Sequence, residues 1–186
     1  DMNLKDGNYD RAQTLLKEAL KRDQNDPVRL GQLYKLLTAR HDTTELYRYH
    51  PRLMAWLVAQ HDGDGLNRLL KQLLVAEPAF QLDDPALAVQ SAETLYRAGH
   101  CKAALRLVQD FHKRFPDSDQ LAPAYLLAAR ALANGLQQWD KAKAFLMFIK
   151  KRCTSHPIHQ QIDTWLEQAE QHQPLKGPRA TFQVPD

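Results

Sequence analysis

Glycine and cysteine are scarce in this chain of 186 residues, which contains seven glycines and two cysteines. Two cysteines that share no CxxC spacing are too few to staple a small scaffold, so we expect both thiols to be reduced and structural. Runs of alternating β-branched residues are also missing, which leaves no credible strand. Because Leu, Ala, Gln, Lys and Arg are abundant, the composition predicts an all-α protein.

Long apolar runs are missing as well. No segment reaches the roughly 18 consecutive apolar residues that a membrane-crossing helix needs, and no basic-then-apolar leader opens the chain. The sequence therefore predicts a soluble segment without a membrane span. It opens almost directly in a helix, without a methionine at position 1, so we expect a further helix upstream of Asp1.

Neither sign of charge dominates, because the chain has 25 basic and 22 acidic residues and a net charge of +3. The two signs are interspersed along the chain. A nucleic-acid-binding protein more often concentrates Lys and Arg on one face, so no nucleic-acid partner is expected. The one tight basic cluster, Lys150 to Arg152, fits the end of a helix, where the helix dipole favours cations.

Motifs of catalysis are missing too: the chain has no GxSxG, HExxH, glycine-rich phosphate loop or DxDxDG loop. We therefore expect a protein that is not an enzyme and holds no cofactor. Cys153, His156 and His159 have a spacing that metal ligands can share. Zinc sites usually need four ligands, or three and water, and Pro157 within this group is better explained by a turn, so no metal is expected.

Residues 84–116 contain the unit that the rest of the chain repeats. Asp84 and Pro85 suit the first positions of a helix, and Gly99 suits its end because glycine readily takes the left-handed conformation. A second apolar stripe then predicts a continuous helix from Cys101 to Pro116. Two antiparallel helices joined by a short turn follow from this pattern.

The same pairing recurs along the chain at a fixed spacing. Leu66, Ala104 and Ala142 take equivalent places early in second helices and lie 38 residues apart. Further helices are expected at 8–22, 27–40, 43–49 (closed by Pro51), 51–60, 66–77, 121–136, 139–152 and 158–171, with a turn at 61–65.

The pair at 84–116 resembles the tetratricopeptide repeat, a 34-residue pair of helices. Gly99, Ala104, Val108, Phe111 and Pro116 follow the order of that repeat: a turn glycine, a small residue, large apolar residues and a closing proline. The resemblance implies a right-handed superhelix of about five antiparallel helix pairs, in a repeat domain over residues 1–172. It also implies a protein-interaction scaffold that binds a protein or peptide on its concave face.

An extended tail is expected at 173–186, where proline and glycine are frequent. Its TFQV segment, with Phe182 and Val184, is the one apolar extended segment near a terminus, so we expect it to occupy the groove of its own or a neighbouring molecule.

The resemblance also implies candidate partner-binding residues, because the first helix of each pair lines the concave face in that family. The polar residues of these helices that packing does not need are Gln90, Glu93, Arg97, Arg130 and Asn134. A plain solvated surface is the alternative reading of the same residues. Val89 and Leu127 stand where relatives that grip a C-terminal carboxylate carry Lys and Asn, which disfavours that type of ligand.

Two other functions stay open. Residues 111–157, with FPDSDQLAPAYLLAARAL, resemble repeats of bacterial cell-envelope scaffolds. The chain could thus be the soluble domain of a larger membrane-associated assembly protein, on the cytoplasmic or periplasmic face of a bacterial membrane. A helical-repeat RNA binder is the other alternative, and it requires a basic concave face.

Overall fold

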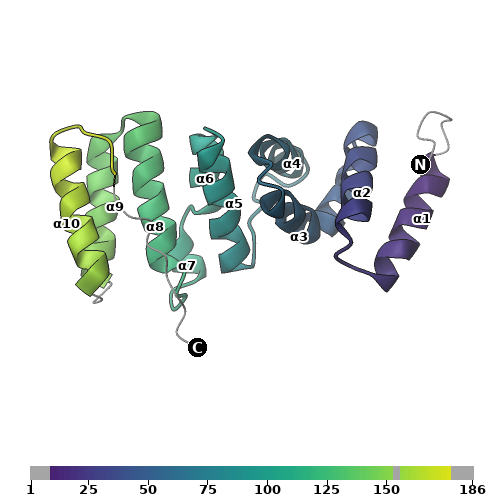
Figure 1. The fold of residues 1–186 in the computed structure, drawn as a ribbon, viewed down its shortest axis with the longest axis horizontal. Helices are drawn as coiled ribbons and strands as arrows, with labels where there is room; N and C mark the ends of the chain where they lie inside the picture. The colour runs from purple at the N-terminus through teal and green to yellow at the C-terminus, as the bar shows by residue number, and fades with distance from the viewer. Residues whose placement is uncertain (1–8, 153–155, 177–186) are drawn as a thin grey trace. The chain divides into compact units, whose positions relative to one another are not determined.

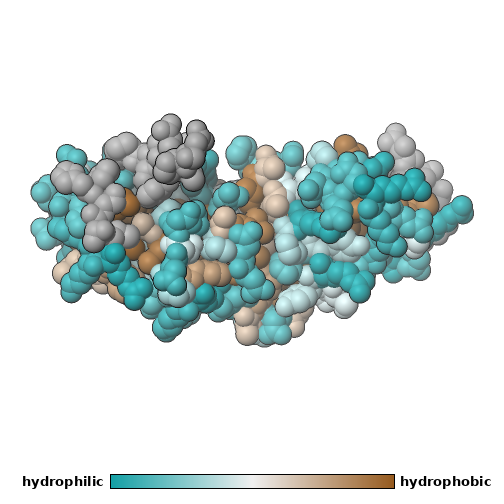
Figure 2. All heavy atoms as spheres, turned by 90° about the horizontal axis from the view of Figure 1, so that it is seen from below, coloured by the Kyte–Doolittle hydropathy of each residue, from teal (hydrophilic) through white to brown (hydrophobic). Residues whose placement is uncertain are grey.

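The computed structural model describes residues 9–152 and 156–176, and every regular element in these ranges is helical (Figure 1). The all-α prediction is therefore confirmed for this part of the chain. Contacts divide the chain into two compact units, residues 1–82 and 83–186, which we call unit 1 and unit 2. Hydrophilic residues cover most of the face drawn in Figure 2, and hydrophobic residues show between them in small groups.

Residues 9–82 of unit 1 contain four helices, each packed against the next in the chain. They are α1 (Tyr9–Arg22), α2 (Pro27–Arg40), α3 (Thr43–Ala59) and α4 (Gly63–Ala76). Their apolar stripes meet in a core of leucines, of which Leu33, Leu37, Leu46, Leu53 and Leu57 are fully buried. Helices spaced by such short turns and striped on one face pack as antiparallel neighbours.

Aspartates begin three of these helices by accepting hydrogen bonds from free backbone amides. Asp26 accepts from the amides of Val28 and Arg29, at 2.9 and 3.0 Å. Asp42 and Asp62 do the same for α3 and α4. Each cap satisfies amides that have no partner within the helix, so the predicted start at Asp26 and Pro27 is confirmed.

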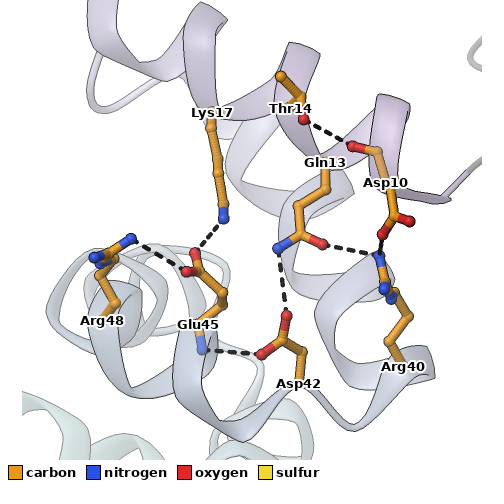
Figure 3. Close-up of polar contacts among 8 residues, drawn as sticks. All are labelled: Asp10, Gln13, Thr14, Lys17, Arg40, Asp42, Glu45 and Arg48. Carbon is orange, nitrogen blue, oxygen red and sulfur yellow. Dashed lines mark hydrogen bonds and ion pairs between the residues drawn. The ribbon is translucent and has the colours of Figure 1, made fainter.

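Polar contacts fasten α1 to the α2–α3 turn (Figure 3). Arg40 at the end of α2 binds Asp10 at 2.6 Å and Gln13 at 3.1 Å. Lys17 reaches Glu45 on α3 at 2.5 Å, and this carboxylate is largely buried. Because α1 contributes few buried residues, these contacts across the helices help to fix its position.

The prediction of a short helix at 43–49 that Pro51 closes is wrong. α3 runs without interruption from Thr43 to Ala59, with Pro51 inside it. Pro51 has no N–H to donate to the carbonyl of Tyr47, four residues earlier, and a proline there usually ends or kinks a helix. Here the ring of His50, with its proton on Nδ1, donates to that carbonyl oxygen at 2.5 Å and replaces the lost hydrogen bond.

We expect His50→Phe to destabilise unit 1 by about 1 kcal/mol, because phenylalanine keeps a ring but leaves the Tyr47 carbonyl without its donor. The ring contacts of His50 with Tyr47 and Phe80 should largely survive this change. The same substitution in a Pro51→Ala background should cost much less, since the new amide at position 51 can bond the carbonyl. Urea unfolding of the four proteins measures the difference. An equal loss in both backgrounds would contradict this role of His50.

The turn expected at 61–65 is shorter in the structure. His61 takes the left-handed conformation with a φ of 54°, and Asp62 already caps α4. Gly63, Asp64 and Gly65 therefore belong to the first turn of α4, and the prediction that they form the turn is wrong. Gly65 is needed for close packing instead, because a Cβ there would lie 2.3 Å from Oδ2 of Asp62 and 2.8 Å from Cδ2 of Leu57.

The predicted 38-residue period is visible in the turns between helices. His61, Gly99 and Gln137 all have positive φ and lie 38 residues apart. After His61 and Gly99 the amide of the following residue bonds a carbonyl five residues earlier, as in the Schellman motif, whereas the amide of Gln138 bonds the carbonyl of Leu132, six residues earlier. Three helix hairpins therefore have a left-handed residue at the same place in the period, although only one of these three residues is a glycine.

Unit 2 contains the remaining helices. They are α5 (Pro85–Arg97), α6 (Cys101–Leu107), α7 (Phe111–Arg114), α8 (Leu121–Arg130), the π-helix η2 (Ala131–Gly135), α9 (Trp139–Arg152) and α10 (His156–Glu170). The chain packs α5 on α6, α8 on α9 and α9 on α10, and α5 also contacts α8. Helix pairs at the predicted positions are thus confirmed, with α10 beginning two residues earlier than expected.

The prediction of one continuous helix from Cys101 to Pro116 is wrong. α6 ends at Leu107, Asp110 takes a left-handed conformation with a φ of 51°, and α7 forms a separate turn. The break frees the carbonyl of Leu107, to which Nη2 of Arg114 donates at 2.8 Å. Asp110 pairs with Lys113 at 2.9 Å, and this ion pair lowers the pKa of its carboxyl. These polar contacts stabilise the break between α6 and α7, where the sequence has no glycine or proline to indicate a helix end.

Candidate functional site

The five predicted binding residues fall into two groups, on α5 and at the end of α8. Glu93 and Arg97 form an ion pair within α5, one turn apart. Gln90 is exposed on the same helix, and its main-chain carbonyl accepts from Thr94. Arg130 and Asn134 lie on α8 and η2, beside residues of two other helices. The structure thus brings only the second group together with other helices.

Asn134 holds the backbone of Leu175, which lies beyond α10. Its Oδ1 accepts from the Leu175 amide at 2.8 Å, and its Nδ2 donates to the Leu175 carbonyl at 3.2 Å. Nδ2 also lies 3.4 Å from the hydroxyl of Tyr96 on α5. One side-chain amide therefore satisfies both backbone groups of a single residue.

Gln168 on α10 holds the next residue in the same manner. Its Oε1 accepts from the Lys176 amide at 2.9 Å, and its Nε2 donates to the Lys176 carbonyl at 3.4 Å. Trp165, one turn earlier, donates its ring N–H to the same carbonyl at 3.1 Å. Two consecutive residues are thus bound through their backbones by two carboxamides and an indole.

Arg130 completes this group of side chains. Its guanidinium carbon lies 5.2 Å from the ring centroid of Tyr96 and 5.9 Å from that of Trp165, within the range of cation–π attraction. Its Nε is buried and has no hydrogen-bond partner among the described residues. We call Tyr96, Arg130, Asn134, Trp165 and Gln168 the amide site.

The chain reaches the amide site by turning sharply at the end of α10 (Figure 1). His172 has a φ of 54°, and the amide of Gln173 bonds the carbonyl of Gln168 at 2.8 Å, which reverses the chain as the other turns do. The ring of His172 stacks on Trp139 at 5.7 Å. Leu175 is then only 1% exposed, whereas Lys176 is exposed.

Sequence reasoning found Arg130 and Asn134 but missed Tyr96, Trp165 and Gln168. One signal was present: Tyr96 and Asn134 are 38 residues apart and so take the same place in successive helix pairs. Trp165 is buried. Nothing in the sequence indicated that its N–H and the amide of Gln168 would meet the chain that follows. The TFQV segment, expected to fill a groove, lies outside the described residues.

A cavity of about 520 Å³ lies beside α8, on the side opposite the amide site. Tyr125, Ala128 and Leu132 line it at helical spacing, whereas Arg130 and Asn134 occupy the opposite face of the same helical run. Burial raises the pKa of Tyr125, whose hydroxyl contacts Nδ1 of His112. Basic residues of α6 and α9 contribute to its lining, among them Lys102 and Lys141.

Side chains suited to metal binding are not assembled in the described ranges. No three His, Cys, Asp or Glu side chains gather there closely enough to hold a metal ion. Cys153 and the side chain of His156, from the group with metal-ligand spacing, lie outside the description. Cys101 is buried, which raises the pKa of its thiol and favours the unreactive protonated form.

The helices of residues 9–152 and 156–176 include none that is long and apolar enough to cross a membrane. In comparisons with known proteins, no family model, no curated protein and no solved structure matches this chain.

Proposed function

We propose that the chain is a non-catalytic protein-interaction module and that unit 2 binds an extended peptide of a partner protein at the amide site. The observation that carries this proposal is the paired hydrogen bonding of Asn134 and Gln168 to the backbones of Leu175 and Lys176. Every peptide has these backbone groups, so the amide site can hold an extended peptide of many sequences.

The burial of the Leu175 side chain adds selectivity for one side chain of the peptide to this backbone recognition. We call the buried position of this side chain the seat of Leu175. Burying a leucine side chain fully is worth about 1.5–3 kcal/mol, which is enough to favour a large apolar residue at this point of a peptide. The next residue contributes its backbone alone, since Lys176 is exposed. A peptide with one large apolar residue followed by a residue of any type therefore fits the site.

The likeness to the tetratricopeptide repeat supports the same proposal. Tyr96 and Asn134 come from the first helices of two successive pairs, and the 38-residue period continues through both. A superhelical array that offers its first helices to an extended ligand accounts for this placement. We propose such an array as the architecture, with a period longer than that of the repeat it resembles.

The alternative of RNA binding is less well supported by the amide site. Arg130 is the one cation among its five residues, and it already stacks on Tyr96 and Trp165. Affinity for RNA depends on many contacts between cations and phosphates. A role as the soluble domain of a larger membrane-associated protein is compatible with peptide binding. The first concerns the protein to which the domain belongs, and the second concerns what the domain binds.

The test uses a chain that ends at Gln173, so that its own residues no longer occupy the site. The probe is a synthetic peptide of sequence Gln-Pro-Leu-Lys, acetylated and amidated. We expect it to shift the side-chain amide resonances of Asn134 and Gln168 in NMR spectra and to bind weakly, as a short peptide should.

Two variants control this experiment. Asn134→Ala should abolish the shifts, because it removes the paired bonds to the leucine of the peptide. Gln160→Ala removes an exposed carboxamide on α10, the helix that carries Gln168, and should leave binding unaltered. If the peptide shifts neither Asn134 nor Gln168 at any concentration, the amide site is not a peptide-binding site.

A further inference from the structure

We infer that residues 174–176 are a tethered competitor, which must leave the amide site before a partner peptide can bind there. This inference rests on the proposed function. Its basis is that this segment already occupies the site. The side-chain amides of Asn134 and Gln168 and the ring N–H of Trp165 all bond its backbone, and its Leu175 side chain is buried there. A partner that used the same donors and acceptors could not bind at the same time.

The tether is short, which makes the competitor strong. Leu175 follows Gln168 by seven residues, and the turn at His172 aims the chain back at the helix it has just left. Short tethers give effective concentrations in the millimolar range. A free peptide with the same contacts must exceed that concentration to displace the segment.

Residues 174–176 are nevertheless held by few contacts, which favours their release. Of the four described residues after His172, Gln173, Pro174 and Lys176 are exposed, and Leu175 alone is buried. The hydrogen bonds that hold the backbones of Leu175 and Lys176 come from side chains. Release therefore exposes one leucine and disrupts none of the main-chain bonds of α10, which are complete at Gln173.

The kind of partner follows from what the segment uses. A competing peptide needs an extended backbone and one large apolar side chain for the seat of Leu175. To displace the tethered segment, the peptide must also make contacts outside the positions of Leu175 and Lys176. An extended stretch of a partner protein that continues beyond these two residues meets this need, whereas a short free peptide does not.

The experiment compares the capped Gln-Pro-Leu-Lys peptide on three chains. One ends at Lys176 and keeps the segment, one ends at Gln173 and lacks it, and one is the whole chain with Leu175→Asp. We expect the peptide to bind the second and third about tenfold or more tightly than the first, because an occupied site lowers the apparent affinity by the fraction that is free. Circular dichroism of all three verifies that they fold.

The outcomes separate the two proposals. Equal affinity for all three chains would overturn the competitor and leave peptide binding intact. Binding to none of them would remove the proposed function itself. If the chain that ends at Lys176 binds the peptide better on dilution, the segment occupies the site of a second copy, and the proposal of an internal competitor is wrong.

Discussion

Phe111→Ala is expected to destabilise unit 2 by about 3–5 kcal/mol, the range for removing a buried aromatic ring from a packed core. Phe111 is the largest of the fully buried side chains among the residues that the structure describes, and it has no exposed surface. Its ring centroid lies 4.9 Å from that of Phe115, and the guanidinium of Arg114 lies 5.9 Å from it. The substitution would leave a cavity beneath α7 and remove both ring contacts.

Urea unfolding measures the loss, and amide hydrogen exchange of α6 to α8 locates it. Phe111→Leu is the matched control, because it keeps most of the volume and should cost less than about 1.5 kcal/mol. A loss below about 1 kcal/mol for Phe111→Ala would mean that α7 is not anchored by this ring.

Helix existence and period could be predicted from the sequence because both depend on local chemistry. Apolar residues at three- and four-residue steps mark a buried face, and Asp26 and Asp84 mark helix starts with a cap that lies next to the helix itself. The 38-residue spacing survives in the turns at His61, Gly99 and Gln137. These features need no information about distant parts of the chain.

Helix continuity could not be predicted, because side chains replaced the expected backbone signals. Pro51 suggested a helix end, but His50 donates the hydrogen bond that the proline cannot. Conversely, nothing suggested the break at Asp110, which is stabilised by Arg114 donating to a freed carbonyl. In both places the deciding contact joins one side chain to one carbonyl, and apolar periodicity does not report such contacts.

Two of the five residues of the amide site were predicted, and the other three were missed for a similar reason. Asn134 and Arg130 were found because they are polar residues of a first helix. Trp165 and Gln168 meet the chain only because it reverses at His172, where no glycine indicates a left-handed conformation. The reversal depends on a stack with Trp139 and on the seat of Leu175, both of which are tertiary contacts.

Gly135 serves close packing and not a turn. It lies two residues before the left-handed residue of the turn in this helix pair, which is Gln137. Gly135 instead closes the π-helix η2 against α6: a Cβ at this position would lie 2.1 Å from Sγ of Cys101 and 3.0 Å from its Cβ. The glycine is therefore required by a close approach between two helices.

Gly135→Ala is accordingly expected to destabilise unit 2 by about 1–3 kcal/mol, as overpacking of a tight contact does. Alanine has the higher helix propensity, by about 1 kcal/mol, so a loss would have to come from the clash and not from the backbone. Thermal or urea unfolding of the variant measures it.

The decisive comparison is the double variant Gly135→Ala with Cys101→Ala. Removing Sγ of Cys101 opens the space that the new methyl group needs, so the cost of Gly135→Ala should fall by at least half in this background. The remaining cost reflects the 3.0 Å approach of the two Cβ positions. Coupling energies of about 0.5–3 kcal/mol are usual for side chains in direct contact, and a value near zero would show that η2 and α6 do not meet through this pair.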